Sequence, residues 1–495
     1  MNRIWLLFLA IATLASATPA QDWTSARSPH FVVSTDAGEK RAREIAARFE
    51  ALRHIFEKLL SSEKLNTPVP LQILGFRSAK GFSQVAPSKD GKPDQGIVGV
   101  FQTGGDMNFI AIDLSTESGF PIVFHEYAHS VLHANFRNLP LWFDEGVAKY
   151  YETAKMDKGH MQIGASPKHL DSFLYHRGLM PVVDLFGVTQ ESKIYGENSE
   201  RRELFYDQSW VMVHYLFDKQ KMGNFGKYME LTVNQHKPIP EAIEAAFGMT
   251  PTKFDSEIAS YLNLSLRQVF NIDDPESIDE NSFVTQPLAS EDAEALIANM
   301  HAHSNDRHEK AVEEYKEVLR KNPNQVDANL GLGYDALVSK NYDQSEAYFR
   351  KAVSADKKNA RSQFFLGILQ LRRTSPDKNK QEYLIDAWNH LKAATTLNPE
   401  MAVAHSELAY ALSKLGDKDG AIKEATLAAR LNKGNESYFV DLAEFYFEFK
   451  KYEQAKAVFE QLLSSNDTKI VALANQRLEA LKTFDEAAGA SAPKQ

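Results

Sequence analysis

Two histidines four residues apart, with a glutamate directly after the first, form the segment best suited to chemistry. The segment reads His125-Glu126-Tyr127-Ala128-His129. Side chains four residues apart share one face of a helix, so both imidazoles can bind a single tetrahedral metal ion. Glu126 is rotated by about 100° from His125 and can approach a metal-bound water without ligating the metal. Taken alone the pattern is a modest signal, because a surface helix with two solvated histidines would also carry it.

A second segment, shortly after His129, supplies a third ligand. Pro140 predicts a turn, and the spacing of the next apolar residues predicts a second helix. These apolar residues are Phe143, Val147, Tyr150 and Tyr151. Glu145, early in that helix, can face the histidines and complete a set of three ligands with one open position. Gly146 removes a side chain where two helices must approach closely.

Together the two segments resemble the Glu-zincin peptidases, and specifically the bacterial peptidase MA-like proteins. The second motif of that family, W-x-x-E-G-x-A-x-Y, matches residues 142–150. The resemblance covers residues 23 to about 265 and implies an α+β zincin-like fold. It also implies one Zn²⁺ ion held by His125, His129 and Glu145, with Glu126 as the general base. The ligand types favour zinc as well, and the short spacer between the segments implies a tight turn.

Tyr206 and His214 lie in a predicted helix further along the chain. In the related aminopeptidases, a tyrosine at a similar distance donates a hydrogen bond to the tetrahedral oxyanion, and the resemblance gives that role to Tyr206. A partly buried core tyrosine is the alternative. His214, about two turns later, could assist, although a core histidine with satisfied hydrogen bonds is favoured.

Other polar residues near the motifs are candidates to position the ligands or the substrate. Asp144 and Glu152 could each orient a ligand histidine through its other ring nitrogen, and the spacing does not decide between them. His133, one turn beyond His129, is expected beside the site or in solvent. Asp106 could bind a substrate amine, but its surroundings depart from the aminopeptidase pattern G-x-M-E-N, so an endopeptidase is favoured. The family resemblance also implies that the edge strand at 108–114 pairs with an extended peptide.

The elements before the motifs alternate between strand and helix patterns. Residues 30–34 and 69–76 read as strands, and 39–60 as an amphipathic helix. Residues 96–101 and 108–114 read as paired strands around a turn at Gly104-Gly105. From Gly119 onward the pattern is helical. Strands followed by helices suggest an α+β domain over 21–270, and the acidic, unpatterned segment 271–290 suggests a linker.

The chain from 291 to 484 repeats with a period of 34 residues. Gly333 and Gly367 occupy the same small-residue position, as do Ala409 and Ala443. About five such units resemble the tetratricopeptide repeat, which implies an all-α superhelix whose concave surface binds a protein or peptide. Another helical array of the same period is the alternative.

Four departures from regularity are expected in this region. The first repeat lacks a clear first helix, and the third has a longer turn near 374–381. Residues 469–484 read as a C-terminal cap helix, and 485–495 read as a disordered tail.

The N-terminus has the pattern of a secretory signal peptide over residues 1–20. Arg3 precedes an apolar run from Ile4 to Leu14, followed by the small-residue stretch Ala15 to Ala20. The run is short for a membrane span, although an N-terminal anchor is an alternative. We therefore expect an exported bacterial protein, periplasmic or secreted, with no membrane span after cleavage.

Composition excludes several other functions. A length of 495 residues suggests two or three domains. The net charge of −10 without a basic run argues against nucleic acid as a partner. With no cysteine, thiol catalysis and cysteine-bound metals are excluded. No Walker-type loop is present, and Ser209 has no nucleophile-elbow context.

The predicted function is an exported zinc peptidase whose repeats bind a protein or peptide. One rival is a scaffold whose peptidase-like domain is catalytically idle, against which the intact Glu126 argues. The other is a metal-dependent hydrolase of a non-peptide bond, because the metal pattern does not separate amides from esters.

Overall fold

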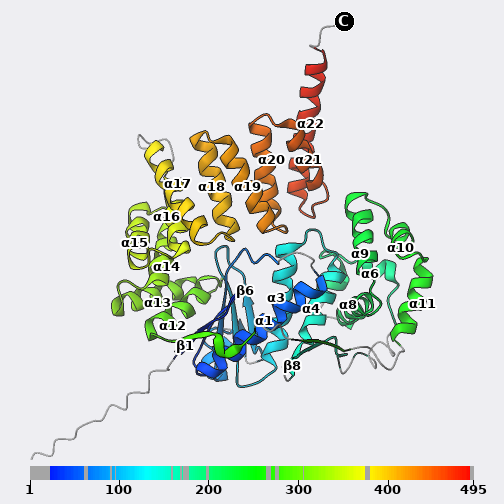
Figure 1. Ribbon diagram of the computed structural model, residues 1–495, viewed down its shortest axis with the longest axis horizontal. Coiled ribbons are helices and arrows are strands. Elements are labelled where there is room, and N and C mark those ends of the chain that lie inside the picture. Colours follow the sequence, from blue (N-terminus) through cyan, green and yellow to red (C-terminus); the bar gives the residue numbers. More distant parts are fainter. Residues whose placement is uncertain are drawn as a thin grey trace, which may run out of the picture.

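The computed structural model describes residues 23–490 apart from short gaps. The gaps are 61–64, 90–91, 95, 158–159, 168–169, 171–177, 197–199, 263–268, 274–277, 305 and 374–379. An N-terminal α/β part lies beneath a helical array that arches over it (Figure 1). The expected signal peptide lies outside the described residues. In the described part of the chain, no helix is both long and apolar enough to cross a bilayer.

A six-stranded mixed sheet forms the centre of the N-terminal part, in the order β11-β1-β2-β3-β7-β6. The strands are β1 (Trp23–Arg27), β2 (Val32–Thr35), β3 (Leu71–Phe76), β6 (Gly99–Gln102), β7 (Asn108–Asp113) and β11 (Val284–Leu288). β2, β3 and β7 are parallel neighbours, and the remaining pairs are antiparallel. The predicted hairpin of β6 and β7 and the predicted helix α1 (Glu39–Leu60) are both confirmed.

Strand β7 is buried on both faces, and this explains its uninterrupted apolar run. Ile110 and Ile112 pack into a core with α1 and the helix α3 (Gly119–Asn135). Phe109 and Ala111 point to the other face, where they share a core with Leu296 of α12 (Ser290–Ala302). The first helix of the array therefore covers one face of the sheet, so the two parts of the chain share a core.

Two predictions about this region are wrong. Strand β7 is not an edge strand, because it lies between β3 and β6, and β6 forms the edge instead. Residues 271–290 are not a free linker, because β10 (Phe270–Asp273) pairs with β9 and β11 pairs with β1. The side chains of β11 are mostly exposed, so this edge strand lacks the alternating apolar pattern that would have revealed it.

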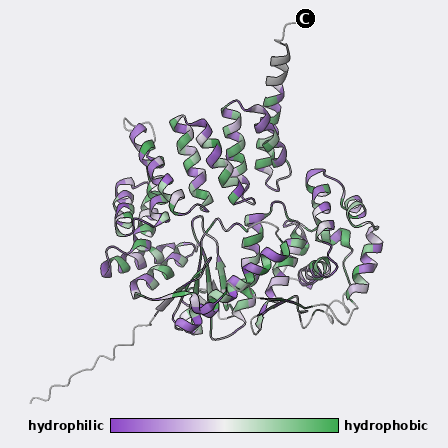
Figure 2. Cartoon of the chain, viewed as in Figure 1, coloured by the Kyte–Doolittle hydropathy of each residue, from purple (hydrophilic) through white to green (hydrophobic). Residues whose placement is uncertain are grey.

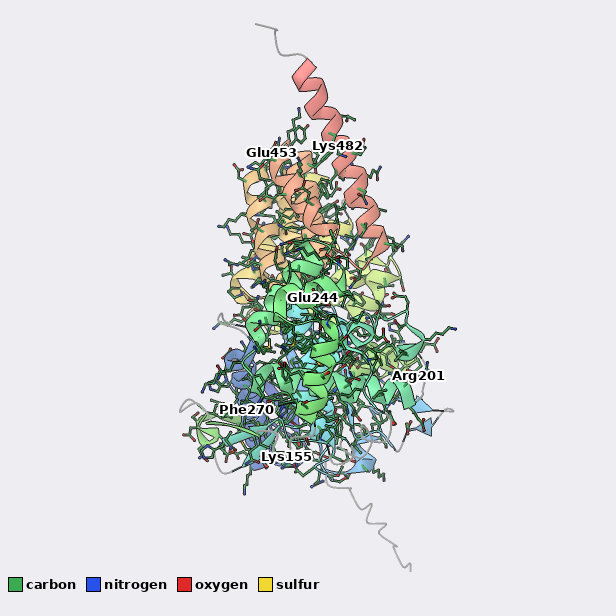
Figure 3. All side chains as sticks on the ribbon, turned by 90° about the vertical axis from the view of Figure 1, so that its right-hand side faces the viewer. Lys155, Arg201, Glu244, Phe270, Glu453 and Lys482 are labelled. Atoms are coloured by element: carbon green, nitrogen blue, oxygen red, sulfur yellow. The ribbon has the colours of Figure 1, made fainter. Side chains whose placement is uncertain are left out.

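The other elements of the N-terminal part include short strands and turns and a helical subregion that ends at residue 262. They comprise α2 (Ala79–Phe82), β4 (Ser88–Lys89), β5 (Lys92–Pro93), α4 (Leu141–Glu152), β8 (Lys155–Asp157), β9 (His160–Ile163), α6 (Val182–Phe186), α7 (Lys193–Gly196), α8 (Glu200–Asp218), α9 (Met222–Met229), a π-helical turn (Glu230–Asn234), α10 (Ile239–Phe247), α11 (Pro251–Leu262) and a 3₁₀ turn (Glu280–Ser282). Strands β10, β9 and β8 form a small sheet. Figure 3 shows its outer strands at the same end of the molecule, marked by Phe270 and Lys155.

The C-terminal region is an all-helical superhelix of tetratricopeptide repeats. After α12 come α13 (His308–Lys321), α14 (Val326–Val338), α15 (Tyr342–Ala355), α16 (Ala360–Arg372), α17 (Lys380–Leu397), α18 (Ala402–Leu415), α19 (Lys418–Leu431), α20 (Glu436–Glu448), α21 (Tyr452–Leu462) and α22 (Thr468–Ala490). The small residue Gly367 allows α16 and α17 to pack closely, because a Cβ at this position would lie 2.7 Å from the Leu391 side chain. Helices of the array carry both hydrophobic and hydrophilic residues (Figure 2).

The departures from regularity that the sequence predicted in the array can be compared with its helices. The first repeat does have a first helix, α12, whose apolar residues serve the sheet as well as α13 and α14. The cap helix α22 extends to Ala490, so the prediction of a disordered tail from 485 is wrong for its first residues, and 491–495 lie outside the described part. The longer turn predicted near 374–381 falls largely on residues that are not described.

The array contacts the N-terminal part near its start and again toward its end. Near its start, the Nε2 of His301 lies 2.8 Å from the carbonyl oxygen of Gln84. Near its end, the turn between α19 and α20 lies against the C-terminal end of α3, where the Lys433 amide donates to the Ala134 carbonyl at 2.9 Å. The array is thus folded back onto the part that carries the candidate site.

Candidate metal centre

The residues of the candidate site come from two adjacent helices, α3 and α4. Helix α3 carries His125, Glu126 and His129, and α4 carries Asp144 and Glu145. The connection between them is short, as predicted, and includes Asn138 with a φ of 53°. Pro140 immediately precedes α4 and its carbonyl accepts the first helical hydrogen bonds. A tight turn therefore brings the start of α4 back alongside the histidines.

Three candidate ligand atoms, one each from His125, His129 and Glu145, lie close together. The Nε2 atoms of His125 and His129 lie 3.2 Å apart, and the Oε2 of Glu145 lies 3.6 Å from the first and 3.4 Å from the second. A tetrahedral ion with bonds of about 2.0–2.1 Å separates its ligand atoms by about 3.3–3.4 Å. The observed triangle matches one face of such a tetrahedron.

The chemistry of this donor set also fits a cation. The Oε2 of Glu145 is buried and makes no hydrogen bond to any described residue. Burial would raise the pKa of Glu145, but His125 and His129 lower it to about 2. Burial would lower the pKa of His129, but Asp144 and Glu145 raise it to about 10. These carboxylates therefore favour positive charge at the two imidazoles, and a bound cation would supply the same charge.

Asp144 and Glu152 lie beside different histidines. Asp144 Oδ1 lies 2.9 Å from the Nδ1 of His129, and Glu152 Oε2 lies 3.3 Å from the Nδ1 of His125. Asp144 Oδ2 lies 2.8 Å from the Nε2 of His133, whose side chain is largely exposed. Burial opposes the ionisation of Asp144, yet the two histidines hold its pKa below the ordinary range. Each of the two candidate ligand imidazoles thus has a different carboxylate beside it, although the Nδ1 of His125 makes no hydrogen bond among the described residues.

Glu126 and Gly146 complete the local arrangement. Glu126 is half-buried and makes no hydrogen bond or ion pair with the described residues. Gly146 allows a close approach, as predicted, but to α8 rather than to the histidine helix. A Cβ at this position would collide with the Ser209 carbonyl and would lie 2.7 Å from Val213.

Tyr195 contacts the site and was not among the predicted site residues. Its hydroxyl donates a hydrogen bond of 2.9 Å to the Oε1 of Glu145. Burial and the nearby Glu145 carboxylate raise the pKa of Tyr195, so the phenol stays protonated. The residue lies in the four-residue helix α7, where neither periodicity nor a motif marks it.

Tyr206 lies next to Tyr195 on α8, with 6.3 Å between the ring centroids. Its hydroxyl accepts hydrogen bonds from Arg202, at 3.3 Å from Nε and 3.2 Å from Nη2. The guanidinium of Arg202 also lies 5.5 Å from the centroids of both tyrosine rings. The role of Tyr206 toward an oxyanion stays a prediction.

Two other candidates lie away from the metal centre. His214 is fully buried, with Nδ1 at 2.5 Å from the Tyr261 hydroxyl and Nε2 at 3.1 Å from the Gly164 carbonyl. It is the core histidine that burial preferences favoured. Asp106 does not offer a substrate anchor, because Arg361 of the array binds its Oδ2 at 2.7 Å.

Comparisons with known proteins support the repeats and leave the N-terminal part without a described function. Tetratricopeptide repeat families match residues 302–360, 330–379 and 437–469. A family described as a protein of unknown function (DUF1570) matches residues 121–239, which include His125, His129 and Glu145. None of the curated proteins matches the chain.

Similar solved structures align with less than half of the chain. A tetratricopeptide repeat protein of Thermus thermophilus, TTC0263, is 20% identical and covers 38% of this chain and 98% of its own, with a TM-score of 0.33. PilF of Pseudomonas aeruginosa is 19% identical and covers 40% and 87%, with a TM-score of 0.34. YrrB, described as having an unusual peptide-binding site, is 21% identical and covers 38% and 93%, with a TM-score of 0.31.

Proposed function

We propose that the chain is an exported zinc-dependent peptidase whose repeat region binds a protein or peptide. The observation that carries the proposal is the triangle of His125, His129 and Glu145, whose ligand atoms have tetrahedral spacing beside the unpaired Glu126. The α3–α4 arrangement under a mixed sheet is compatible with the zincin-like fold that the motifs resemble. The signal-like residues 1–20 support export.

Each residue of the site has a chemical task in peptide hydrolysis. When bound, zinc would polarise the scissile carbonyl and lower the pKa of a water molecule in the cleft. Glu126 would accept a proton from that water as its oxygen bonds to the carbonyl carbon. It would then give the proton to the nitrogen as the C–N bond breaks. Tyr206 would donate to the oxyanion, while Asp144, Glu152 and Tyr195 hold the ligand side chains in place.

The position of Asp106 supports an endopeptidase. An aminopeptidase needs an acidic group free to bind the substrate's α-amine, and Asp106 was the candidate for it. Its carboxylate is instead 12% exposed and bonded to Arg361. Strand β6 is the edge of the six-stranded sheet, and edge strands are where an extended peptide can pair with a sheet.

The proposal is tested with residues 21–495, measured for zinc content and for cleavage of casein and a peptide library. We expect one zinc per chain, with cleavage that Glu126→Gln lowers by about 10²–10⁴-fold while zinc stays bound. A matched control is Glu117→Gln, since Glu117 is an exposed glutamate whose ion pairs with Arg41 and Arg48 lie outside the site. Equal cleavage by the wild type and Glu126→Gln would refute the assigned base.

The same experiment addresses the two rivals. The scaffold is favoured by the repeats themselves, which commonly present binding surfaces. Zinc binding without cleavage by any form would support it. Cleavage of ester substrates with no cleavage of any peptide would support a non-peptide hydrolase.

A further inference from the structure

A cavity of about 360 Å³ lies within the first repeats of the array, away from the metal centre. Its wall is mostly apolar and aromatic. It includes Tyr315, Leu330, Tyr334, Phe364, Phe365 and Ile368. Tyr334 on α14 is 50% exposed although its ring lies 5.7 Å from that of Phe365. The cavity can hold a large side chain, and its half-exposed aromatic rim would gain from being covered.

The N-terminal part closes one side of this cavity. Gly105 and Asp106, in the turn between β6 and β7, are part of the lining. Asp106 is held there by Arg361 of α16, with Nε and Nη2 each 2.7 Å from its Oδ2. The cavity is therefore a composite of both parts of the chain and is complete only when the array is docked.

The charged groups of the cavity neutralise one another. The remaining guanidinium nitrogen of Arg361, Nη1, binds Asp327 at 2.6 Å. His308 lies 3.0 Å from Asp335. His303, the third basic residue of the lining, lies 3.8 Å from the Oδ1 of Asp106. Each basic group among the described lining residues is therefore beside a carboxylate, and an acidic ligand would meet no unpaired positive charge there. An uncharged apolar side chain fits this lining better than a carboxylate does.

One polar group in the lining lacks a partner. Asn299 is 2% exposed, and its Oδ1 accepts a hydrogen bond of 2.7 Å from the Tyr315 hydroxyl. Its Nδ2 is buried and donates to no group among the described residues. A buried donor without an acceptor is unfavourable. A peptide carbonyl that enters the cavity would satisfy it.

We infer that this cavity binds an extended peptide segment through one large apolar side chain, with Asn299 donating to the peptide backbone. The peptide would lie against the turn that follows β6, which is the edge strand of the sheet and contacts α3. The cavity thus anchors the substrate at a distance from the cleaved bond; this role as a substrate anchor rests on the proposed function.

The test measures peptide binding by fluorescence anisotropy with the mature chain carrying Glu126→Gln, which prevents cleavage. The probe is a labelled decapeptide of Gly, Ser and Thr with one central Phe, compared with probes carrying Ala or Asp there. We expect the Phe probe to bind at least about tenfold more tightly than either. Tyr334→Ala should weaken its binding about tenfold.

Tyr410→Ala is the matched control. Tyr410 holds the same repeat position on α18 and is 43% exposed, but it lies outside the cavity. We expect the Tyr410→Ala variant to bind the Phe probe as tightly as the parent protein does. The Tyr334→Phe variant should retain most of the affinity for this probe. Equal losses in the Tyr334→Ala and Tyr410→Ala variants, tighter binding of the Asp probe, or no binding of the Phe probe at about 1 mM would overturn the inference.

Failure of the anchor is distinguishable from failure of the peptidase. Binding to the cavity requires neither zinc nor Glu126, so it should persist in the zinc-free protein. Loss of Phe-selective binding with cleavage intact would refute the anchor alone. Selective binding without cleavage by the wild type would refute the peptidase alone.

Discussion

The Tyr195 hydroxyl and the Glu145 carboxylate form a hydrogen bond of 2.9 Å that uses the Oε1 of Glu145. The other oxygen, Oε2, is left facing the Nε2 atoms of His125 and His129. The phenol thus holds the carboxylate in the orientation that a single metal–oxygen bond requires. Partners of this kind strengthen metal binding without touching the metal.

We expect Tyr195→Phe to weaken zinc binding by about 10–100-fold, because Glu145 can then rotate. Competition with a chromogenic chelator measures the affinity. Tyr206→Phe is the control: it should leave zinc affinity unchanged and lower kcat, as an oxyanion donor would. A Tyr195→Phe variant that binds zinc as the wild type does would refute this role of the hydroxyl.

A second set of residues near the site could also bind a metal ion. His129, His133 and Asp144 also place one possible ligand atom each within 4.8 Å of one another. In this set Asp144 already bonds both imidazoles, and His133 is 61% exposed. We therefore expect His133→Ala to keep one zinc per chain.

His129→Ala, in contrast, should lose the zinc, because it removes one of three ligands. Metal content after dialysis against a weak chelator measures both variants. Zinc lost in His133→Ala and retained in His125→Ala would show that the second set is the binding site.

The sequence predicted those features that depend on local patterns. Helix α1 follows from its apolar spacing, and the ligand triangle follows from the four-residue spacing of two histidines and an adjacent helix. Tyr195 was not predictable in this way, because it reaches Glu145 from a four-residue helix fifty residues away in the chain. The pairing of β11 with β1 and the packing of α12 on the sheet depend on contacts between distant segments of the chain. The side chains of β11 are mostly exposed, so they show no apolar periodicity that would predict a strand.

The Asp106–Arg361 ion pair should make docking of the array sensitive to acid. Burial would raise the pKa of Asp106, but Arg361 and His303 lower it to about 2, from 3.8. A carboxyl with a lowered pKa stabilises the folded state above its unfolded pKa, and this contribution is lost as the pH falls through the folded pKa. The ion pair should therefore stabilise the protein fully above about pH 5 and lose its effect toward pH 2.

We expect Asp106→Asn to lower the free energy of unfolding by about 2 kcal/mol at pH 6, with the difference shrinking toward zero near pH 2. Denaturant unfolding of both proteins across this range measures it. Asp343→Asn is the control, because Asp343 pairs with Arg373 while its own side chain is 100% exposed. A difference between wild type and Asp106→Asn that does not change with pH would contradict the assignment.

Gly434 should be essential for the docking of the array on α3. It lies in the turn between α19 and α20, where a Cβ would collide with the carbonyl oxygen of His133 at the C-terminal end of α3. The adjacent Lys433 amide donates to the Ala134 carbonyl, and Arg137 lies 3.3 Å from Glu436. Gly434→Ala should push this turn off α3 and destabilise the protein by about 1–3 kcal/mol.

Hydrogen exchange provides the specific measurement, because the Lys433 amide should lose protection when its acceptor on α3 moves away. Gly223→Ala is the matched control: a Cβ there meets nothing within 4 Å, and alanine favours the helix in which it lies. Unchanged protection of Lys433 in Gly434→Ala would mean that the turn tolerates the methyl group without separating from α3. The array would then be held chiefly by its first repeats, through Arg361 and the core shared with the sheet.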